Sequence, residues 1–210
     1  MKKAILALAL LPLTAQAAHF EIGAGFAHGV RDANGFWYQE GNPYQMRVNS
    51  PTGYVGVTGH AWKYLDWHID YVYLGSYSVD SWDETDQAYG NGCRGSHCAG
   101  GYYHFQGAGF MQGVRLTVGP TVAFGHWHLS AQLGPYVYRA TWHVTYQDST
   151  WACPRTIRHT PRFQVGSVVG ATLRYRRVSL GVAEYFMNVP QDVYPPLIHG
   201  SWAMTAAYRF

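Results

Sequence analysis

The last ten residues of the chain, 201–210, read SWAMTAAYRF. Every second position carries an apolar side chain, and the positions between them carry mostly small or polar ones. The apolar set is Trp202, Met204, Ala206, Tyr208 and Phe210. A period of two residues is typical of a β-strand whose two faces meet different surroundings. The end of the chain therefore predicts a strand with one apolar face.

The same alternation returns along the whole chain, for example at residues 20–26, 67–73, 114–118 and 129–133. Between these segments lie clusters of Gly, Pro, Asn, Asp and Ser that favour turns. The pattern predicts eight strands, near residues 19–30, 51–62, 66–75, 104–124, 127–142, 163–175, 178–189 and 197–210.

The connections between the expected strands alternate in length. Short turns fall at 63–65, 125–126 and 176–177, whereas long connections fall at 31–50, 76–103 and 143–162, with a shorter one at 190–196. Membrane barrels have short periplasmic turns and long outer loops. After the N-terminal region, no segment approaches the ~18 consecutive apolar residues of a spanning helix. The expected fold is all-β, an eight-stranded antiparallel up-and-down transmembrane barrel.

Composition excludes several other classes. Only 13% of the 210 residues are charged and 16% are aromatic, which argues against a disordered chain. The formal net charge of +3 is too small to favour a nucleic acid as a partner.

Residues 1–17 have the composition of a secretory signal peptide. Lys2 and Lys3 precede an apolar run at 4–13, and Ala15-Gln16-Ala17 supplies a small-x-small cleavage pattern. We therefore expect a signal peptide at 1–17, export, and a barrel domain at 18–210.

With its alternating apolar positions, Tyr208 and the terminal Phe210, the C-terminal stretch resembles the assembly signal of bacterial outer-membrane barrels. The mature chain is similar in plan to small barrels of the OmpA, OmpX and Ail/Lom type. The resemblance implies a monomer integral to the outer membrane of a Gram-negative cell. It also implies contact with outer-membrane lipid and lipopolysaccharide, and assembly by the barrel assembly machinery.

The polar positions of the strands should face the lumen, which in an eight-stranded barrel is just wide enough for side chains to fill. We expect Arg115 and Arg174 to pair with Glu21 and Asp70. This salt-bridge core is favoured over a conducting pore, and a gated narrow channel stays open as an alternative. The expected core comprises Glu21, His68, Asp70, Arg115, Gln132 and Arg174.

Aromatic residues gather where the strands end, as they do at the two interfaces of a membrane barrel. One predicted girdle lies near the short turns, with Trp62, Tyr64, Trp67, Phe124, Trp127, Tyr175 and Phe210. The other lies near the long connections, with Tyr73, Tyr77, Tyr138, Trp142 and Phe163.

Glu184 shares the apolar parity of residues 178–182, where a carboxylate facing lipid is costly. A β-bulge around Ala183 would turn it inward. In the alternative, Ser201 is a nucleophile, His199 its base and Glu184 the orienting group, an arrangement that resembles the His-x-Ser of lipid A deacylases. The match is limited, because Trp202 stands where that family has Asn. We therefore predict no catalytic residue and a protein that is not an enzyme, with lipid A modification by a deacylase or acyltransferase as the alternative.

Cys93 and Cys98 are expected to form a disulfide in an exported chain, with a metal site that includes His97 as the rival interpretation. The state of Cys153 stays open. His126 and His128 have a spacing that suits a metal, but a solvated turn is the preferred interpretation, and neither a metal nor a cofactor is expected.

These observations predict a non-catalytic role in surface interaction, adhesion or envelope integrity. The long extracellular loops would carry that role.

Overall fold

The computed structural model describes residues 18–31, 44–85, 101–148, 155–158, 163–187 and 198–210. All regular elements in these ranges are strands: β1 (His19–Arg31), β2 (Tyr44–Arg47), β3 (Asn49–Trp62), β4 (Leu65–Thr85), β5 (Gly101–Phe124), β6 (Trp127–Asp148), β7 (Arg155–Arg158), β8 (Phe163–Tyr175), β9 (Val178–Phe186) and β10 (Ile198–Arg209). Nowhere in these ranges does a helix have the length and apolar character needed to cross a bilayer.

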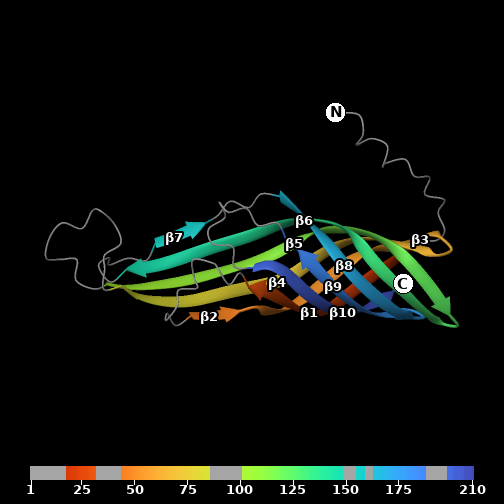
Figure 1. Cartoon of the computed structure of the whole chain (residues 1–210), viewed down its shortest axis with the longest axis horizontal. Coiled ribbons are helices and arrows are strands. Elements are labelled where there is room, and N and C mark those ends of the chain that lie inside the picture. Colours follow the sequence, from red (N-terminus) through yellow and green to blue (C-terminus); the bar gives the residue numbers. More distant parts are fainter. Residues whose placement is uncertain (1–17, 32–43, 86–100, 149–154, 159–162, 188–197) are drawn as a thin grey trace, which may run out of the picture.

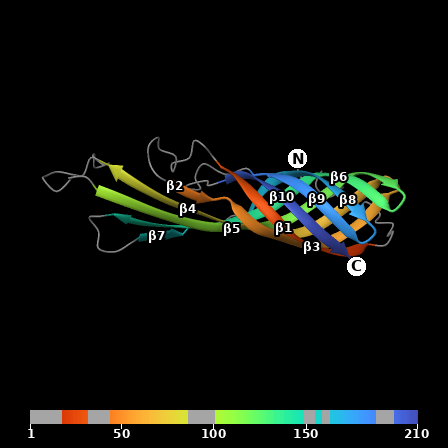
Figure 2. The same ribbon diagram turned by 90° about the horizontal axis from the view of Figure 1, so that it is seen from below.

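Eight of the described strands close into a ring (Figures 1 and 2). The order around it is β1, β3, β4, β5, β6, β8, β9 and β10, and β10 pairs again with β1. Every pairing in the ring is antiparallel. The predicted fold class, a closed eight-stranded antiparallel barrel, is confirmed.

Three strands are longer than expected. β4 runs to Thr85, β5 begins at Gly101 and β6 runs to Asp148, so parts of the expected connections 76–103 and 143–162 are strand. β2 pairs with β4 and β7 with β6 along the sides of this sheet, and β2 occupies part of the expected connection 31–50. We call residues 76–85, 101–110 and 140–148 the strand extension. Figure 2 shows it projecting well beyond the rest of the barrel.

Gly75 interrupts the alternation of β4 and so decides which residues enter the lumen. Its φ of +107° is open to glycine but strained for other residues, and the pairing with β5 shifts register between Tyr73 and Gly75. Before this bulge Val72 and Leu74 are buried, and after it Tyr77 and Val79 are buried. One extra residue therefore exchanges the faces of β4.

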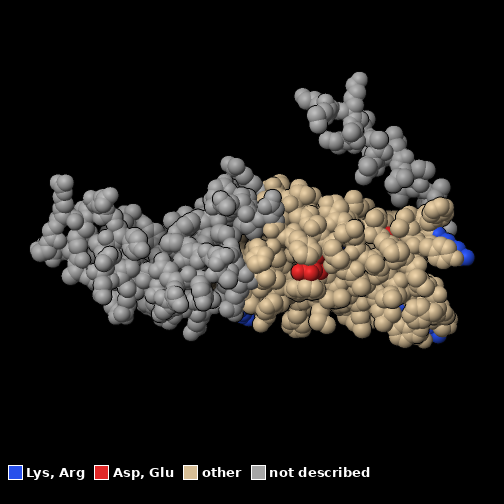
Figure 3. All heavy atoms as spheres, viewed as in Figure 1, with Lys and Arg blue, Asp and Glu red and all other residues tan. Residues whose placement is uncertain are grey.

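The outward positions of the ring form an apolar wall. Figure 3 shows this wall almost free of charged groups on the face in view, apart from an acidic group near its middle. Its exposed apolar residues include Phe20, Ile22, Phe26, Val55, Val57, Ile69, Val114, Leu116, Val118, Leu129, Leu133, Val165, Val169, Leu180, Val182 and Met204. Apolar residues face outward and polar residues inward, the reverse of a water-soluble fold.

Candidate functional site

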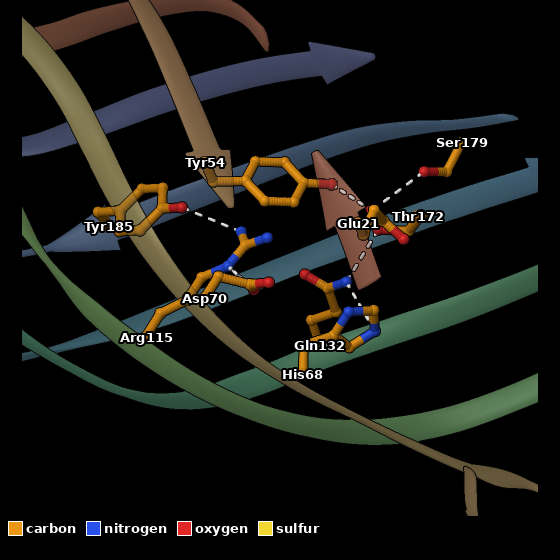
Figure 4. Close-up of polar contacts among 9 residues, drawn as sticks. All are labelled: Glu21, Tyr54, His68, Asp70, Arg115, Gln132, Thr172, Ser179 and Tyr185. Atoms are coloured by element: carbon orange, nitrogen blue, oxygen red, sulfur yellow. Dashed lines mark hydrogen bonds and ion pairs between the residues drawn. The ribbon is translucent and has the colours of Figure 1, made fainter. Parts of the chain in front are cut away.

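The centre of the lumen is built on a buried ion pair. Arg115 Nε lies 2.6 Å from Asp70 Oδ2, and the two residues face each other directly in the register of β4 and β5. The guanidinium also donates to the Tyr185 hydroxyl at 3.0 Å and lies 4.8 Å from the centre of the Tyr54 ring. Figure 4 shows these groups converging from β3, β4, β5 and β9. The structure thus brings together the expected Arg115 and Asp70, with two tyrosines around them.

Glu21 is held by hydroxyl groups. The hydroxyls of Tyr54 and Ser179 both donate to Glu21 Oε1, the latter at 3.3 Å (Figure 4). The expected pairing of Glu21 with Arg174 is not among the ion pairs of the described residues, although Arg174 is buried on the inner face. A neutral hydroxyl stabilises a buried carboxylate through a hydrogen bond alone, without an opposite charge, but it also adds no second charge that must be desolvated.

A second group of polar contacts lies toward the short turns. Gln132 Nε2 donates to Thr172 Oγ1 at 2.9 Å and lies 3.3 Å from His68 Nε2. Below it, Ser130 donates to Asp66 at 2.8 Å, and His60 Nδ1 lies 2.5 Å from the same carboxylate. The expected His68 and Gln132 are therefore in contact with each other.

Sequence reasoning missed Tyr54, Asp66, Ser179 and Tyr185. Asp66 has the same parity as His68 and Asp70, so continuing the alternation by two residues would have found it. Tyr54 and Tyr185 also have the inward parity of their strands, but tyrosine is enriched at the membrane interfaces, so its residue type did not indicate the lumen.

Bulky side chains fill the other half of the lumen. Tyr136 stacks on Tyr138 with ring centres 5.3 Å apart, and Tyr185 meets Tyr136 edge-on at 5.0 Å. Tyr77 and Trp142 lie beside them, with ring centres 6.4 Å apart. Leu74 and Met111 are buried in the same apolar cluster.

The second predicted girdle was therefore partly wrong. Tyr77, Tyr138 and Trp142 are buried in the lumen, whereas Phe163 is 77% exposed on the wall. The Gly75 bulge turned Tyr77 inward, and the parity of β6, which places Tyr136 inside, also places Tyr138 inside. Six of the seven residues of the girdle near the short turns are exposed, namely Trp62, Tyr64, Phe124, Trp127, Tyr175 and Phe210, whereas Trp67 is half-buried.

Ser201, His199 and Glu184 do not form a common site. Ser201 is fully buried on the inner face, where its hydroxyl lies 3.3 Å from the Tyr77 hydroxyl and donates to the His28 carbonyl at 3.3 Å. Beside His199 the pairing of β10 with β1 shifts register, and His199 is exposed. The two side chains are therefore not on the one face that their spacing suggested.

Glu184 remains on the outer parity of β9. It faces Trp202 on one side and Val169 on the other, and the register of β9 is continuous with both neighbours. The hypothesis of a bulge around Ala183 was wrong, and Ala183 itself is buried on the inner side. Ser201 and Glu184 are thus separated by the barrel wall.

The remaining expected residues differ in what the structure describes. Tyr208 and Phe210 lie exposed, with ring centres 5.1 Å apart, and Phe210 also contacts Phe20 at 5.8 Å. His126 packs edge-on against Tyr175, and the described residues contain no group of three metal-ligating side chains. The signal peptide at 1–17, His97, the expected disulfide of Cys93 and Cys98, and Cys153 lie outside the described residues.

No family model and no curated protein matches the chain. Solved structures of small outer-membrane barrels do. Ail of Yersinia pestis is 12% identical, with 92% of this chain and 97% of that chain covered and a TM-score of 0.37. Ail in complex with the heparin analogue sucrose octasulfate is 11% identical with the same coverage and a TM-score of 0.40. Neisserial surface protein A is 10% identical, with 93% and 100% covered and a TM-score of 0.39. The likeness is one of fold.

Proposed function

We propose that this chain is a monomeric, integral outer-membrane barrel with a non-catalytic role at the cell surface, in surface interaction, adhesion or envelope integrity. The observation that carries the surface role is the strand extension, which continues the barrel wall far past the end of the ring. A barrel that only spanned a membrane would not need strands of 21 to 24 residues.

Membrane insertion is supported by the apolar wall. In hydrocarbon every backbone N–H and C=O must be paired within the protein, and a closed ring of strands achieves this. The chain combines such a ring with outward apolar residues and with exposed aromatic residues around the short turns. Export by the signal peptide and insertion by the assembly machinery are part of this proposal.

The strand extension carries a polar groove on its outer face. The groove has a volume of about 490 Å³ and is lined by Arg47, Ser78, Val79, Asp80, Gln106, Gly107, Ala108, His143 and Thr145. Arg47, Ser78, Ala108 and His143 follow one another across four paired strands, so small residues separate the two basic ones. The Asp80 carboxylate already has partners: His104 Nε2 lies 2.7 Å from Oδ1, and Gln106 Nε2 donates to Oδ2 at 3.3 Å. This arrangement suits an anionic, hydroxyl-rich ligand such as a glycan or the headgroup region of lipopolysaccharide.

Binding of a sulfated sugar tests this role. We expect cells that display the protein to retain labelled sucrose octasulfate, and the Arg47→Ala/His143→Ala variant to retain several-fold less, because the groove loses its two basic side chains. Flow cytometry or calorimetry on the purified protein measures the effect. Arg139→Gln, which removes an exposed arginine outside the groove, is the matched control. Equal retention by all three proteins would contradict the proposed role of the groove.

Lipid A analysis separates this function from the enzymatic alternative. Because Ser201 and Glu184 lie on opposite faces of the wall, we expect the acylation pattern of lipid A to be the same in cells with and without the protein. Mass spectrometry of extracted lipid A measures it. A pattern that changes with the protein, and reverts with Ser201→Ala, would establish the enzyme and overturn the proposal.

A further inference from the structure

The end of the barrel with the short turns is basic. The turn residues are Lys63-Tyr64, Gly125-His126 and Arg176-Arg177, and they include three cations and no carboxylate. Figure 3 shows Lys and Arg side chains gathered at this end of the molecule. The β3–β4 and β8–β9 turns lie on opposite sides of the ring, because β5 and β6 separate them on one side and β10 and β1 on the other.

Each turn cation lies against a tyrosine. Lys63 Nζ is 5.2 Å from the centre of the Tyr64 ring, and Arg176 Cζ is 5.4 Å from that of Tyr175. Arg177 donates to the Tyr208 hydroxyl at 3.3 Å. These three tyrosines are exposed on the outer wall. Tyrosine in a membrane barrel marks the boundary between acyl chains and headgroups, so the cations lie at the level of the lipid phosphates.

Arg176 occupies a backbone conformation that favours another residue. Its φ is +54°, and it is the only described non-glycine residue with a positive φ. In the β5–β6 turn the corresponding conformation, with φ of +63°, is taken by Gly125. Glycine and asparagine adopt this region at least cost in a two-residue hairpin turn. The energetics of the turn therefore do not explain why an arginine occupies the positive-φ position of the β8–β9 turn.

The turn cations are also not used in ion pairs within the described chain. The carboxylates that form such pairs there are Asp66, Asp70 and Asp80, and their partners are His60, Arg115 and His104. Lys63, Arg176 and Arg177 therefore have charge available for a ligand from outside the chain.

We propose that Arg176, Arg177 and Tyr208 form a binding site for the phosphate of an anionic phospholipid in the leaflet next to the short turns. Lys63 and Tyr64 form a second, weaker site across the barrel. A guanidinium pair can bind phosphate oxygens through several N–H donors, and the tyrosines pack against the glycerol backbone. The inference rests on the proposed membrane insertion. A lipid fits better than a periplasmic protein, because the cations contact tyrosines that are exposed on the outer wall.

Native mass spectrometry of the purified full barrel in neutral detergent tests the site, with phosphatidylglycerol and phosphatidylcholine of identical acyl chains as probes. We expect phosphatidylglycerol to be retained preferentially. The Arg176→Asn/Arg177→Gln variant should lower its affinity about fivefold for each arginine removed. The affinity for phosphatidylcholine should change little. Arg139→Gln, far from the turns, is the control and should behave as the parent.

Thermal unfolding of the parent and of the single variant Arg176→Asn distinguishes a lipid role of Arg176 from a structural one. Asparagine suits a positive φ better than arginine, so Arg176→Asn should unfold at the parent's temperature or above it while binding less phosphatidylglycerol. Equal retention of both lipids by the parent, or unchanged selectivity in the double variant, would overturn the site. The proposed site would also be overturned if the two arginines bound an acidic periplasmic protein and not the phospholipid. Failure of the parent to insert into any vesicle would instead refute the membrane function.

Discussion

Replacing Arg115 by methionine is expected to lower the free energy of unfolding of the barrel by about 3–5 kcal/mol, because the substitution leaves a buried carboxylate without its cation. The Arg115 and Asp70 side chains are only 6% and 1% exposed, so water cannot take over the solvation of Asp70. The Tyr185 hydroxyl also loses the hydrogen bond that it accepts from the guanidinium. Urea titration of the refolded barrel in micelles, followed by tryptophan fluorescence, measures the change.

A double variant separates the cost of an orphaned charge from the value of the pair. Arg115→Met with Asp70→Leu removes both charges and keeps the lumen filled, so most of the lost stability should return. If Arg115→Met were as stable as the parent, solvent would have to reach Asp70. The lumen would then not be filled by side chains.

A charged side chain on the outer wall should lower the stability of the barrel, by an amount that depends on its depth in the bilayer. Val118 is 49% exposed and lies about halfway along β5 between the aromatic residues Phe110 and Phe124. In a lipid bilayer, Val118→Arg is expected to reduce stability by about 2–4 kcal/mol, since the guanidinium would lie near the bilayer midplane. Unfolding of the protein from phospholipid vesicles measures this effect.

Val122→Arg is the matched control. Val122 has the same parity on the same strand and is 59% exposed, but it lies beside the girdle residue Phe124. Near an interface the cost falls to about 0–1 kcal/mol. Equal costs at Val118 and Val122 would mean that the wall is not immersed in hydrocarbon, and the proposed membrane insertion would fail.

The lumen shows where sequence reasoning succeeded and where it stopped. The period of two residues predicted which polar residues face the lumen, and all six of them are buried on the inner face. They are Glu21, His68, Asp70, Arg115, Gln132 and Arg174. The pairing of Asp70 with Arg115 depends on the register of two strands joined by a long connection, which the alternation does not set. That Glu21 bonds to Tyr54 depends on the adjacent strand β3.

Bulges account for two of the faces that sequence reasoning assigned wrongly, whereas Tyr138 and Trp142 are inward by the regular parity of β6. Tyr77 was assigned to a girdle and His199 to the face of Ser201, and in both places a register shift lies in the strand. A bulge adds one residue without changing the composition around it, so an alternating pattern carries little trace of it. The bulge hypothesised at Ala183 is absent: the register of β9 is continuous with both neighbours, and Glu184 stays on the outer parity.

The sequence by itself determined that the chain forms strands, where most of them begin and end, and which face of each is apolar, because these properties depend on neighbours two residues apart. Its turn residues also determined which end of the barrel is basic. Only the tertiary structure decided the partners across the lumen, the filling of one half by tyrosines and the separation of Ser201 from Glu184. Those outcomes depend on the stagger of strands far apart in the chain, which ring closure sets for all of them together.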